Sequence, residues 1–300
     1  MGVDKIIATF SIVARDPDTG EFGVAVQSKF LAVGAAVPWA RAGVGAVATQ
    51  AWANVAYGPE GLVLLEQGLT APEVAQRLIA ADEGRDYRQL GVVDAHGTAA
   101  AYTGSKCMHW AGHRVGKGFT CQGNILVSAD TVDAMAEAYE VSAALPHLAD
   151  RLVEALAAAQ KAGGDSRGKQ SAALYVVRPN GGYGGFNDRL VDLRVDDHPE
   201  PIEELRRLLD LHRQTWLNPT PPARYRLDSP ERIRLLQSLL RELGAFDGSV
   251  TGELTFNTRG ALAAYCAQNR LEDMDASGEW LPGETMVALR SALAQLRSAR

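Results

Sequence analysis

The chain has 300 residues, of which 46% are hydrophobic and 22% are charged. These values are ordinary for a globular protein and exclude a disordered, collagen-like or membrane-embedded chain. Lys and Arg number 30 against 36 Asp and Glu, a net charge of −6, so we expect neither nucleic acid nor a membrane surface as a partner.

The length and the cysteine content of the chain limit its number of domains and its cross-links. At roughly 150 residues per domain, this length predicts two domains. The three cysteines show no C-x-x-C spacing, which argues against a disulfide framework or a structural zinc site. The apolar stretch after Lys5 is interrupted at Arg15-Asp16 and lacks the cleavage pattern of an export signal. We therefore expect a cytoplasmic protein.

The first two thirds of the chain alternate blocks of strands with blocks of helices. A hairpin is predicted first, with strands over residues 9–15 and 22–28 joined by a turn rich in Asp, Pro and Gly. Further elements are expected as a strand over 44–50, a helix over 61–67, a helix opened by the capping box Thr70-x-x-Glu73, a hairpin over 90–94 and 98–103, a strand over 119–127, helices over 131–140 and 148–161, strands over 171–177 and 190–195, and a helix over 202–211. This order predicts an α+β fold with antiparallel sheets rather than an alternating parallel sheet.

The clearest break in the chain is the segment Asn218-Pro-Thr-Pro-Pro222. Neither a helix nor a strand interior tolerates three prolines in four positions, so we predict a linker over residues 216–228. Beyond it, Ser229-Pro230 is typical of a helix start, and two more helices are predicted over 256–269 and 285–296. Residues 229–300 therefore read as a small three-helix domain.

Several familiar catalytic motifs are missing from the sequence. The glycines of 112–118 lack the spacing and the Ser or Thr of a phosphate-binding loop, and the chain has no G-x-S-x-G elbow. His109 and His113 are four residues apart but lack the Glu of the H-E-x-x-H zinc motif, so we interpret them as the wall of a polar loop.

A sharper chemical signal lies at the start of the first strand. Thr9 follows a leader of eight residues, and Ser28-Lys29 ends the strand that returns. An N-terminal threonine combines a hydroxyl nucleophile with its own α-amine, whose pKa of about 7.7–8.0 suits it as a base. A neighbouring lysine would keep that amine neutral. Strand propensity alone also explains a threonine at this position.

The acidic segment Asp192-Leu-Arg-Val-Asp-Asp-His198 is open to two interpretations. Strand alternation puts Asp192, Arg194 and Asp196 on one face, which suits a hard-cation site. The same residues suit an ion-paired strand end that caps the helix following His198. The glycine loops of 163–168 and 181–188 are explained by turn chemistry, although ligands also approach the backbone at such loops.

Taken together, several segments resemble the uncharacterised domain-of-unknown-function family DUF1028, which is regarded as part of the N-terminal-nucleophile (Ntn) hydrolase superfamily. The resemblance covers residues 9 to 215 and rests on the segments 9–16, 23–34, 48–54, 122–124, 163–168 and 192–198. It implies a four-layer αββα sandwich, amide-bond hydrolysis without a cofactor or metal, and a homo-oligomer.

The resemblance also implies roles for individual residues. Thr9 takes the position of the nucleophile, with Ser28 and Lys29 as supporting polar groups and Asn124 or a backbone N–H as the oxyanion donor. The residues expected to border the cleft or bind substrate are Thr49, Gln50, Asn54, Asp165, Arg167, Asp196 and His198. A free amine on Thr9 requires cleavage after Ala8 or a later translation start; otherwise the mechanism must do without the amine.

The tail has a resemblance of its own. The leucines and glycines of residues 229–296 are similar to those of a peptidoglycan-binding domain. That similarity implies binding of peptidoglycan fragments. An amphipathic three-helix module equally serves docking or dimerisation.

Three functional hypotheses follow from the sequence. The leading one is an Ntn amidohydrolase acting on a small peptide-like or cell-wall-derived amide. The alternative is a non-catalytic protein that binds a small ligand or muropeptide on the same scaffold. A third is a metal-assisted hydrolase that uses Asp192, Asp196 and His198. Processing before Thr9 discriminates between the first two.

Overall fold

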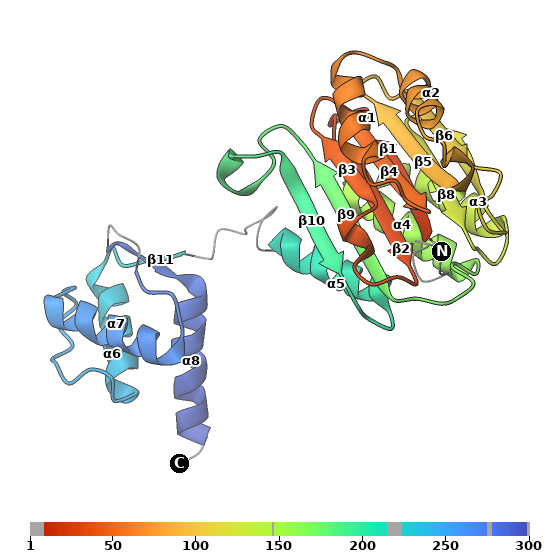
Figure 1. Cartoon of the computed structure of the whole chain (residues 1–300). Helices are drawn as coiled ribbons and strands as arrows, with labels where there is room; N and C mark the ends of the chain where they lie inside the picture. Colours follow the sequence, from red (N-terminus) through yellow and green to blue (C-terminus); the bar gives the residue numbers. More distant parts are fainter. Residues whose placement is uncertain (1–8, 146, 215–223, 275–277, 299–300) are drawn as a thin grey trace. The chain divides into compact units, whose positions relative to one another are not determined.

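The computed structural model describes residues 9–145, 147–214, 224–274 and 278–298 (Figure 1). The chain divides into two compact units, Met1–Trp216 and Leu217–Arg300, and each is described by itself. Within the described ranges, no helix has both the length and the apolar character needed to cross a membrane. The predicted leader of residues 1–8 lies outside the described residues.

Two antiparallel sheets form the centre of the first unit. The six-stranded sheet has the order β10-β9-β2-β1-β8-β7 and the four-stranded sheet the order β3-β4-β5-β6. The strands are β1 (Thr9–Arg15), β2 (Phe22–Ser28), β3 (Pro38–Arg41), β4 (Gly45–Ala51), β5 (Arg88–Asp94), β6 (Ala99–Thr103), β7 (Gly112–Gly116), β8 (Phe119–Asn124), β9 (Ser171–Val177) and β10 (Arg189–Val195). The predicted mixture of helices with antiparallel sheets is therefore confirmed.

The two sheets pack face to face, and helices cover the outer face of each (Figure 1). Helices α1 (Tyr57–Glu66) and α2 (Ala71–Ala80) pack on the four-stranded sheet. The six-stranded sheet carries α3 (Asp130–Val141), α4 (Leu148–Lys161) and α5 (Pro201–His212). Short 3-10 helices cover Val33–Ala35, Arg85–Tyr87, Ser142–Ala144 and Tyr183–Gly185. The capping box predicted at Thr70 and Glu73 is present at the start of α2.

Strand β1 lies in the middle of its sheet, and both of its faces are buried. Its residues alternate between the two faces, as in any β-strand. Val13 packs between the sheets with Ala46, Ala48 and Val93 of the four-stranded sheet. On the other face Ala14 lies opposite Gly23, where an added Cβ would approach Leu152 of α4 to 2.4 Å.

The observed elements differ from the predicted ones at a few positions. Strand β8 ends at Asn124 rather than at 127, because Ile125 adopts a left-handed backbone conformation with φ 53° and turns the chain out of the sheet. Helix α1 begins at Tyr57, four residues before its predicted start. Strands β3 and β7 were not predicted, since both are short and have exposed positions.

The second unit has a small core of its own. Its elements are β11 (Arg224–Arg226), α6 (Pro230–Glu242), α7 (Phe256–Asn269), β12 (Trp280–Pro282) and α8 (Gly283–Ser298). Ser229 caps α6 as predicted, with its hydroxyl accepting a hydrogen bond from the backbone of Arg232. The end of the segment expected to be a linker instead forms β11, which pairs with β12.

A buried amide joins α6 to the loop that precedes α7. Gln237 is 1% exposed. Its Nε2 donates to the carbonyl of Glu253 at 3.0 Å and to the hydroxyl of Thr258 at 3.0 Å, while its Oε1 accepts from the backbone of Gly252 at 2.9 Å. One side chain thus meets both a donor and an acceptor of this loop.

We expect Gln237→Leu to destabilise the second unit by about 1–3 kcal/mol, because the loop groups would be left buried without partners. Native-state hydrogen exchange of the α6 and α7 amides measures this loss. Gln268→Leu, on the exposed face of α7, is the matched control and is expected to change little. Equal protection in the two variants would contradict the assigned role.

Candidate active site

Four polar side chains form a row across one end of the six-stranded sheet. In the strand register Ser171 lies opposite Ser28, Ser28 opposite Thr9, and Thr9 opposite Asn124. Residues directly opposite each other in antiparallel strands share a face of the sheet. Ser11, two residues along from Thr9, bonds to Gln50 of the other sheet, so this face lies between the sheets. All four side chains are fully buried in the full-length chain.

A chain of hydrogen-bonded amides and hydroxyls runs through the space between the sheets. The hydroxyl of Ser11 donates to Gln50 Oε1 at 2.6 Å, and Gln50 Nε2 donates to Gln89 Oε1 at 2.8 Å. On the other side, Gln122 Nε2 donates to Ser11 Oγ at 2.7 Å, and Thr120 donates to Gln122 Oε1 at 2.8 Å. These groups are neutral, so the layer avoids the large cost of burying charge.

Backbone carbonyls fix the orientation of the central amide. Gln89 Nε2 lies 2.7 Å from the carbonyl oxygen of Gly123 and 3.1 Å from that of Gly112. A carbonyl oxygen can only accept, so the NH2 end of Gln89 must face them. Its Oε1 is then the acceptor for both Gln50 and Asn124.

The amide of Asn124, which lies opposite Thr9, is oriented by Gln89 in turn. Asn124 Nδ2 donates to Gln89 Oε1 at 2.9 Å, which an inverted amide could not do. Asn124 Oδ1 is buried and has no hydrogen-bond partner in the described parts of the chain. An unmet buried acceptor is costly, so this oxygen marks a place where a further donor fits.

A glycine in the opposite sheet makes room for this layer. A Cβ on Gly91 of β5 would lie 2.4 Å from Gln122 Oε1 and 2.5 Å from Thr120 Oγ1. Only glycine lets the strand approach these polar groups so closely.

The loop of residues 163–168 lies across the point where β1 begins. Asp165 Oδ2 accepts from the backbone of Lys29 at 3.0 Å, and the backbone of Ser166 donates to the carbonyl of Ile125 at 2.9 Å. Lys29 follows β2 and Ile125 follows β8, the two neighbours of β1. Two consecutive loop residues therefore reach both sides of the strand that starts at Thr9.

The charged residues predicted here come together at this loop. Asp165 is buried and binds Arg167 through Nε at 3.2 Å and through a terminal nitrogen at 3.0 Å. Lys29 is exposed, and its Nζ donates to the carbonyl of Lys169 at 3.3 Å. The carboxylate of Asp165 thus orients Arg167 and the backbone that carries Lys29.

Of the three polar residues predicted around the end of β4, Gln50 enters the space between the sheets. Thr49 lies on the outer face of β4, opposite Leu90, and its hydroxyl donates to the carbonyl of Asn54 at 3.0 Å. Asn54 Nδ2 donates to Asp82 at 3.3 Å. Thr49 and Asn54 therefore hold the turn after β4.

Asp82 is the centre of a structural clamp beneath that turn. It accepts from Arg88 Nε at 2.8 Å, from the hydroxyl of Tyr57 at 2.9 Å and from the backbone of Gly84 at 2.6 Å. The bond from Arg88, with the others, holds the pKa of Asp82 well below its usual value against the opposing effect of burial. Arg88 also donates to the carbonyl of Trp52 at 2.5 Å, which ties the clamp to the turn.

The acidic segment near the end of β10 is structural in its described contacts. Asp192 pairs with Arg189 and Arg194. The Nδ1 atom of His198 accepts from the backbone of Glu200 at 3.0 Å, just before α5. Among the described residues there is no cluster of three or more His, Cys, Asp or Glu side chains placed to hold a metal. This geometry favours the ion-paired, helix-capping interpretation of the segment.

His113 belongs to the polar layer rather than to a loop wall. It lies on β7 opposite Gln122, and its Nδ1 is 2.8 Å from Thr103 Oγ1. Thr103 accepts from Gln89 at 3.0 Å, and its own proton is free to donate to His113 Nδ1 when that nitrogen carries no proton. Burial, followed by the charge of Arg114, lowers the pKa of His113. The ring is therefore neutral when this bond forms.

Sequence reasoning missed most of the residues in this layer, namely Ser11, Gln89, Thr103, His113, Thr120 and Gln122. One signal could have revealed them. The segments Thr9-x-Ser11 and Thr120-x-Gln122-x-Asn124 place polar residues at every second position of otherwise apolar strands. Such alternation marks one polar face, and here that face is buried.

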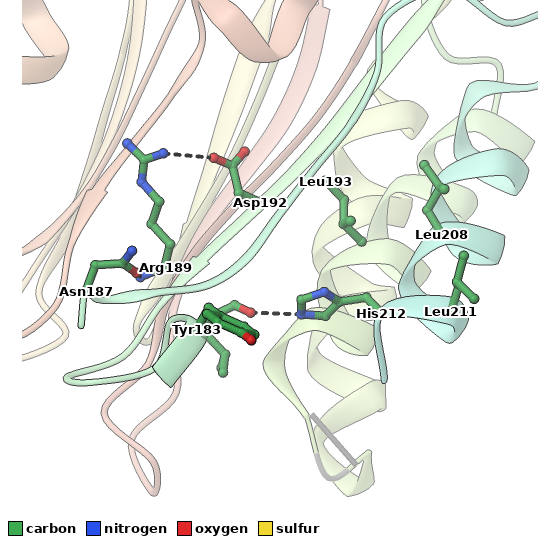
Figure 2. Close-up of a pocket in the computed structure, with 9 residues that line it drawn as sticks. Tyr183, Asn187, Arg189, Asp192, Leu193, Leu208, Leu211 and His212 are labelled. Atoms are coloured by element: carbon green, nitrogen blue, oxygen red, sulfur yellow. Dashed lines mark hydrogen bonds and ion pairs between the residues drawn. The ribbon is translucent and has the colours of Figure 1, made fainter. Parts of the chain in front are cut away.

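A separate cavity of about 400 Å³ lies between β10 and α5 (Figure 2). Leu208 and Leu211 of α5 line one side, and Asp192 with its partner Arg189 lines the other. His212 bonds to the backbone of Leu190 at 2.9 Å. The cavity borders the start of β10, so it lies toward the end of the sheet opposite to Thr9. Of the residues considered in the sequence analysis, its lining includes Asp192 but none of those predicted for the amidohydrolase.

Comparisons with known proteins give a family but no activity. A family model described as "Family of unknown function (DUF1028)" matches residues 9–205. Protein SPO2555 from Silicibacter pomeroyi, a DUF1028 protein of known crystal structure, is 34% identical, with a TM-score of 0.62 over 69% of this chain and 89% of that chain. No curated protein matches the chain.

The amide of Gln89 is expected to be essential for stability. Gln89→Met keeps the volume but leaves the carbonyls of Gly112 and Gly123 and the amide of Asn124 unsatisfied, which predicts a loss of about 3 kcal/mol or more. Denaturant unfolding of the first unit measures it. Gln67→Met, an exposed position at the end of α1, should change stability by less than about 0.5 kcal/mol. Similar losses in the two variants would refute the network's role.

We expect the free energy of unfolding to fall in mild acid because the ring of His113 becomes protonated. Its pKa is lowered in the folded state, so the unfolded chain binds the proton first. The contribution of the neutral ring is complete above about pH 6.5 and is lost as the pH falls toward the folded pKa. His113→Asn keeps an acceptor without a titrating ring, so its unfolding free energy should depend less on pH between 7 and 5. If the unfolding free energies of the wild type and His113→Asn changed in parallel with pH, this role of His113 would be disproved.

Proposed function

The chain belongs to the DUF1028 family of unknown function, and from that premise we propose that its first unit is an Ntn amidohydrolase with Thr9 as nucleophile. One observation carries the proposal. Thr9 begins the central strand β1 and lies between Ser28 and Asn124, in a row that faces the space between two sheets. A threonine at this position presents its hydroxyl and, once residues 1–8 are removed, its amine to the same space.

The arrangement of layers supports this proposal. Two antiparallel sheets pack face to face, with α1 and α2 on one outer face and α3, α4 and α5 on the other. This is the order expected for the αββα sandwich of the Ntn hydrolases. The likeness to a DUF1028 crystal structure at 34% identity supports the same scaffold without indicating a reaction.

The proposed chemistry needs only groups at the start of β1. The Thr9 hydroxyl attacks the carbonyl carbon of the amide while the Thr9 amine takes its proton. The amine then gives that proton to the leaving nitrogen as the C–N bond breaks. Water hydrolyses the resulting ester, which releases the acid and restores the Thr9 hydroxyl.

Asn124 is suited to two tasks in this reaction. One of its Nδ2 hydrogens is held by Gln89, which leaves the second to donate to an oxyanion. Its unpartnered Oδ1 can accept an N–H from the substrate amide or from the Thr9 amine. Because Gln89 fixes the amide, neither group has to reorient during the reaction.

A second candidate function rests on the burial of Thr9. Its side chain has no exposed surface in the full-length chain, so a substrate reaches it only after the site opens. A chain that keeps residues 1–8 would hold Thr9 as an ordinary amide without a base. The scaffold would then serve to bind a small ligand without catalysis.

The second unit is proposed to recruit cell-wall-derived ligands. Arg226 lies over the ring of Trp280 at 5.1 Å, and Arg232 lies over Tyr225 at 5.8 Å, so aromatic and cationic groups gather near β11 and β12. Because these arginines already cover a face of each ring, support for binding of peptidoglycan fragments comes from the likeness of the leucines and glycines of residues 229–296 to a peptidoglycan-binding domain. Docking to another protein, assembly into a homo-oligomer and a cytoplasmic location stay predictions of the sequence.

Intact mass of the purified protein tests the proposed function directly. We expect the wild type to lose residues 1–8 and Thr9→Ala to retain them, because only a hydroxyl can attack the preceding carbonyl. Thr9→Ser keeps the hydroxyl and should also be processed.

Persistence of residues 1–8 in all three proteins would leave Thr9 without a base and favour the ligand-binding alternative. Loss of these residues from Thr9→Ala as readily as from the wild type would assign the cleavage to another protease.

A further inference from the structure

Apolar residues follow the strand ends beside the Thr9 row, some of them buried and some exposed. Trp52 follows β4 and packs on Ile125, which follows β8. Val55 and Val127 lie further along the same two loops and are exposed, as is Met108, whose carbonyl accepts from the backbone of Ile125 at 3.1 Å. We call these five residues the apolar rim. They come from loops at the end of the sheets where Thr9 lies.

The backbone of the rim is strained on both sides. Ala51, at the end of β4, has φ 65°, and Ile125, just after β8, has φ 53°. A left-handed conformation is unfavourable for residues with a Cβ, and for a β-branched residue it is rare. Such strain tends to be retained at functional sites, where it aims side chains. Here the strained positions are Ile125 itself and the residue before Trp52, and these two side chains pack on each other.

A cation lies on the other side of β1. Lys29 is exposed, and within the described residues its Nζ has a carbonyl partner but no carboxylate. The neighbouring cations are compensated, since Arg167 pairs with Asp165 and Lys169 pairs with Glu200. Lys29 is therefore the charge of this group that remains available to an anionic ligand.

The spacing of these features matches one kind of molecule. Lys29 directly follows β2 and Ile125 directly follows β8, the two strands that flank β1, so the backbones at these two residues are about two strand spacings apart, roughly 9–10 Å. Thr9 begins the strand between them, and Asn124, whose Oδ1 has no partner in the described parts of the chain, directly precedes Ile125 on the side of the apolar rim. An amide centred on Thr9 would point one substituent at the apolar rim and the other at Lys29.

We propose that the substrate is an N-acyl amino acid, an apolar acyl group joined by an amide bond to an amine that carries a carboxylate. The acyl group lies on the apolar rim, the amide N–H donates to Asn124 Oδ1, and the carboxylate pairs with Lys29. The hydrolytic step rests on the proposed function: water adds OH to the acyl carbon and H to the nitrogen, which gives a carboxylic acid and a free amino acid.

Equilibrium dialysis of the purified wild-type protein, with its intact mass recorded, tests this assignment with three probes. N-octanoylglycine has both features, N-octanoylglycinamide lacks the charge, and N-acetylglycine lacks the apolar chain. We expect N-octanoylglycine to bind about tenfold more tightly than either of the others, because each loses one set of contacts. Released glycine is quantified in the same samples.

Variants separate the two contacts. Lys29→Gln should abolish the preference for N-octanoylglycine over its amide, whereas Lys117→Gln, an exposed lysine in the turn between β7 and β8 at the opposite end of the sheet, should keep it. Val127→Ser, at an exposed position, should weaken both octanoyl probes and leave N-acetylglycine unchanged.

The outcomes distinguish this inference from the proposed function. Equal binding of N-octanoylglycine and its amide, or no saturable binding, overturns the substrate class whether or not glycine is released. The expected preference without released glycine supports the ligand class and counts against the amidohydrolase.

Discussion

The amide of Gln89 faces two backbone carbonyls that can only accept hydrogen bonds, and this constraint propagates through the space between the sheets. With the Gln89 amide fixed, Gln50 and Asn124 must both present their NH2 groups to it. Ser11 must then donate to Gln50. Each polar group in this layer has one allowed orientation, which makes the layer a rigid support for the row that contains Thr9.

A polar layer between two sheets is an unusual use of a core position. Apolar side chains would give the same packing with less dependence on hydrogen-bond geometry. Here the apolar contacts between the sheets lie further along the strands, around Val13 and Val24, while the amides occupy the end nearest Thr9. The division lets one end of the interface supply stability and the other supply oriented donors and acceptors, as a site that binds an amide requires.

Local signals in the sequence were sufficient for most elements of the fold. The first hairpin, α4, β9 and α7 were predicted at their observed bounds, because their apolar periodicity agrees with their caps and turns.

The site was harder to predict. Ser28 lies opposite Thr9 through the predicted first hairpin, but Asn124 joins the row only through pairing of β1 with the distant strand β8, which no local pattern encodes. Gln89 and His113 carry no motif, since their roles arise from backbone carbonyls and hydroxyls on neighbouring strands. The metal site considered for Asp192, Asp196 and His198 is not formed among the described residues. Asp192 instead pairs with Arg189 and Arg194.

The loop that crosses the start of β1 has a consequence for biosynthesis. Thr9 is synthesised before its partners, because its neighbours in the sheet include Asn124 and the residues that bridge over it are Asp165 and Ser166. At roughly 5–20 residues per second, more than 150 further residues take on the order of ten seconds or more to be made. During that time Thr9 has no completed site around it. Any cleavage before Thr9 that depends on this geometry therefore occurs only after the domain has been synthesised and folded.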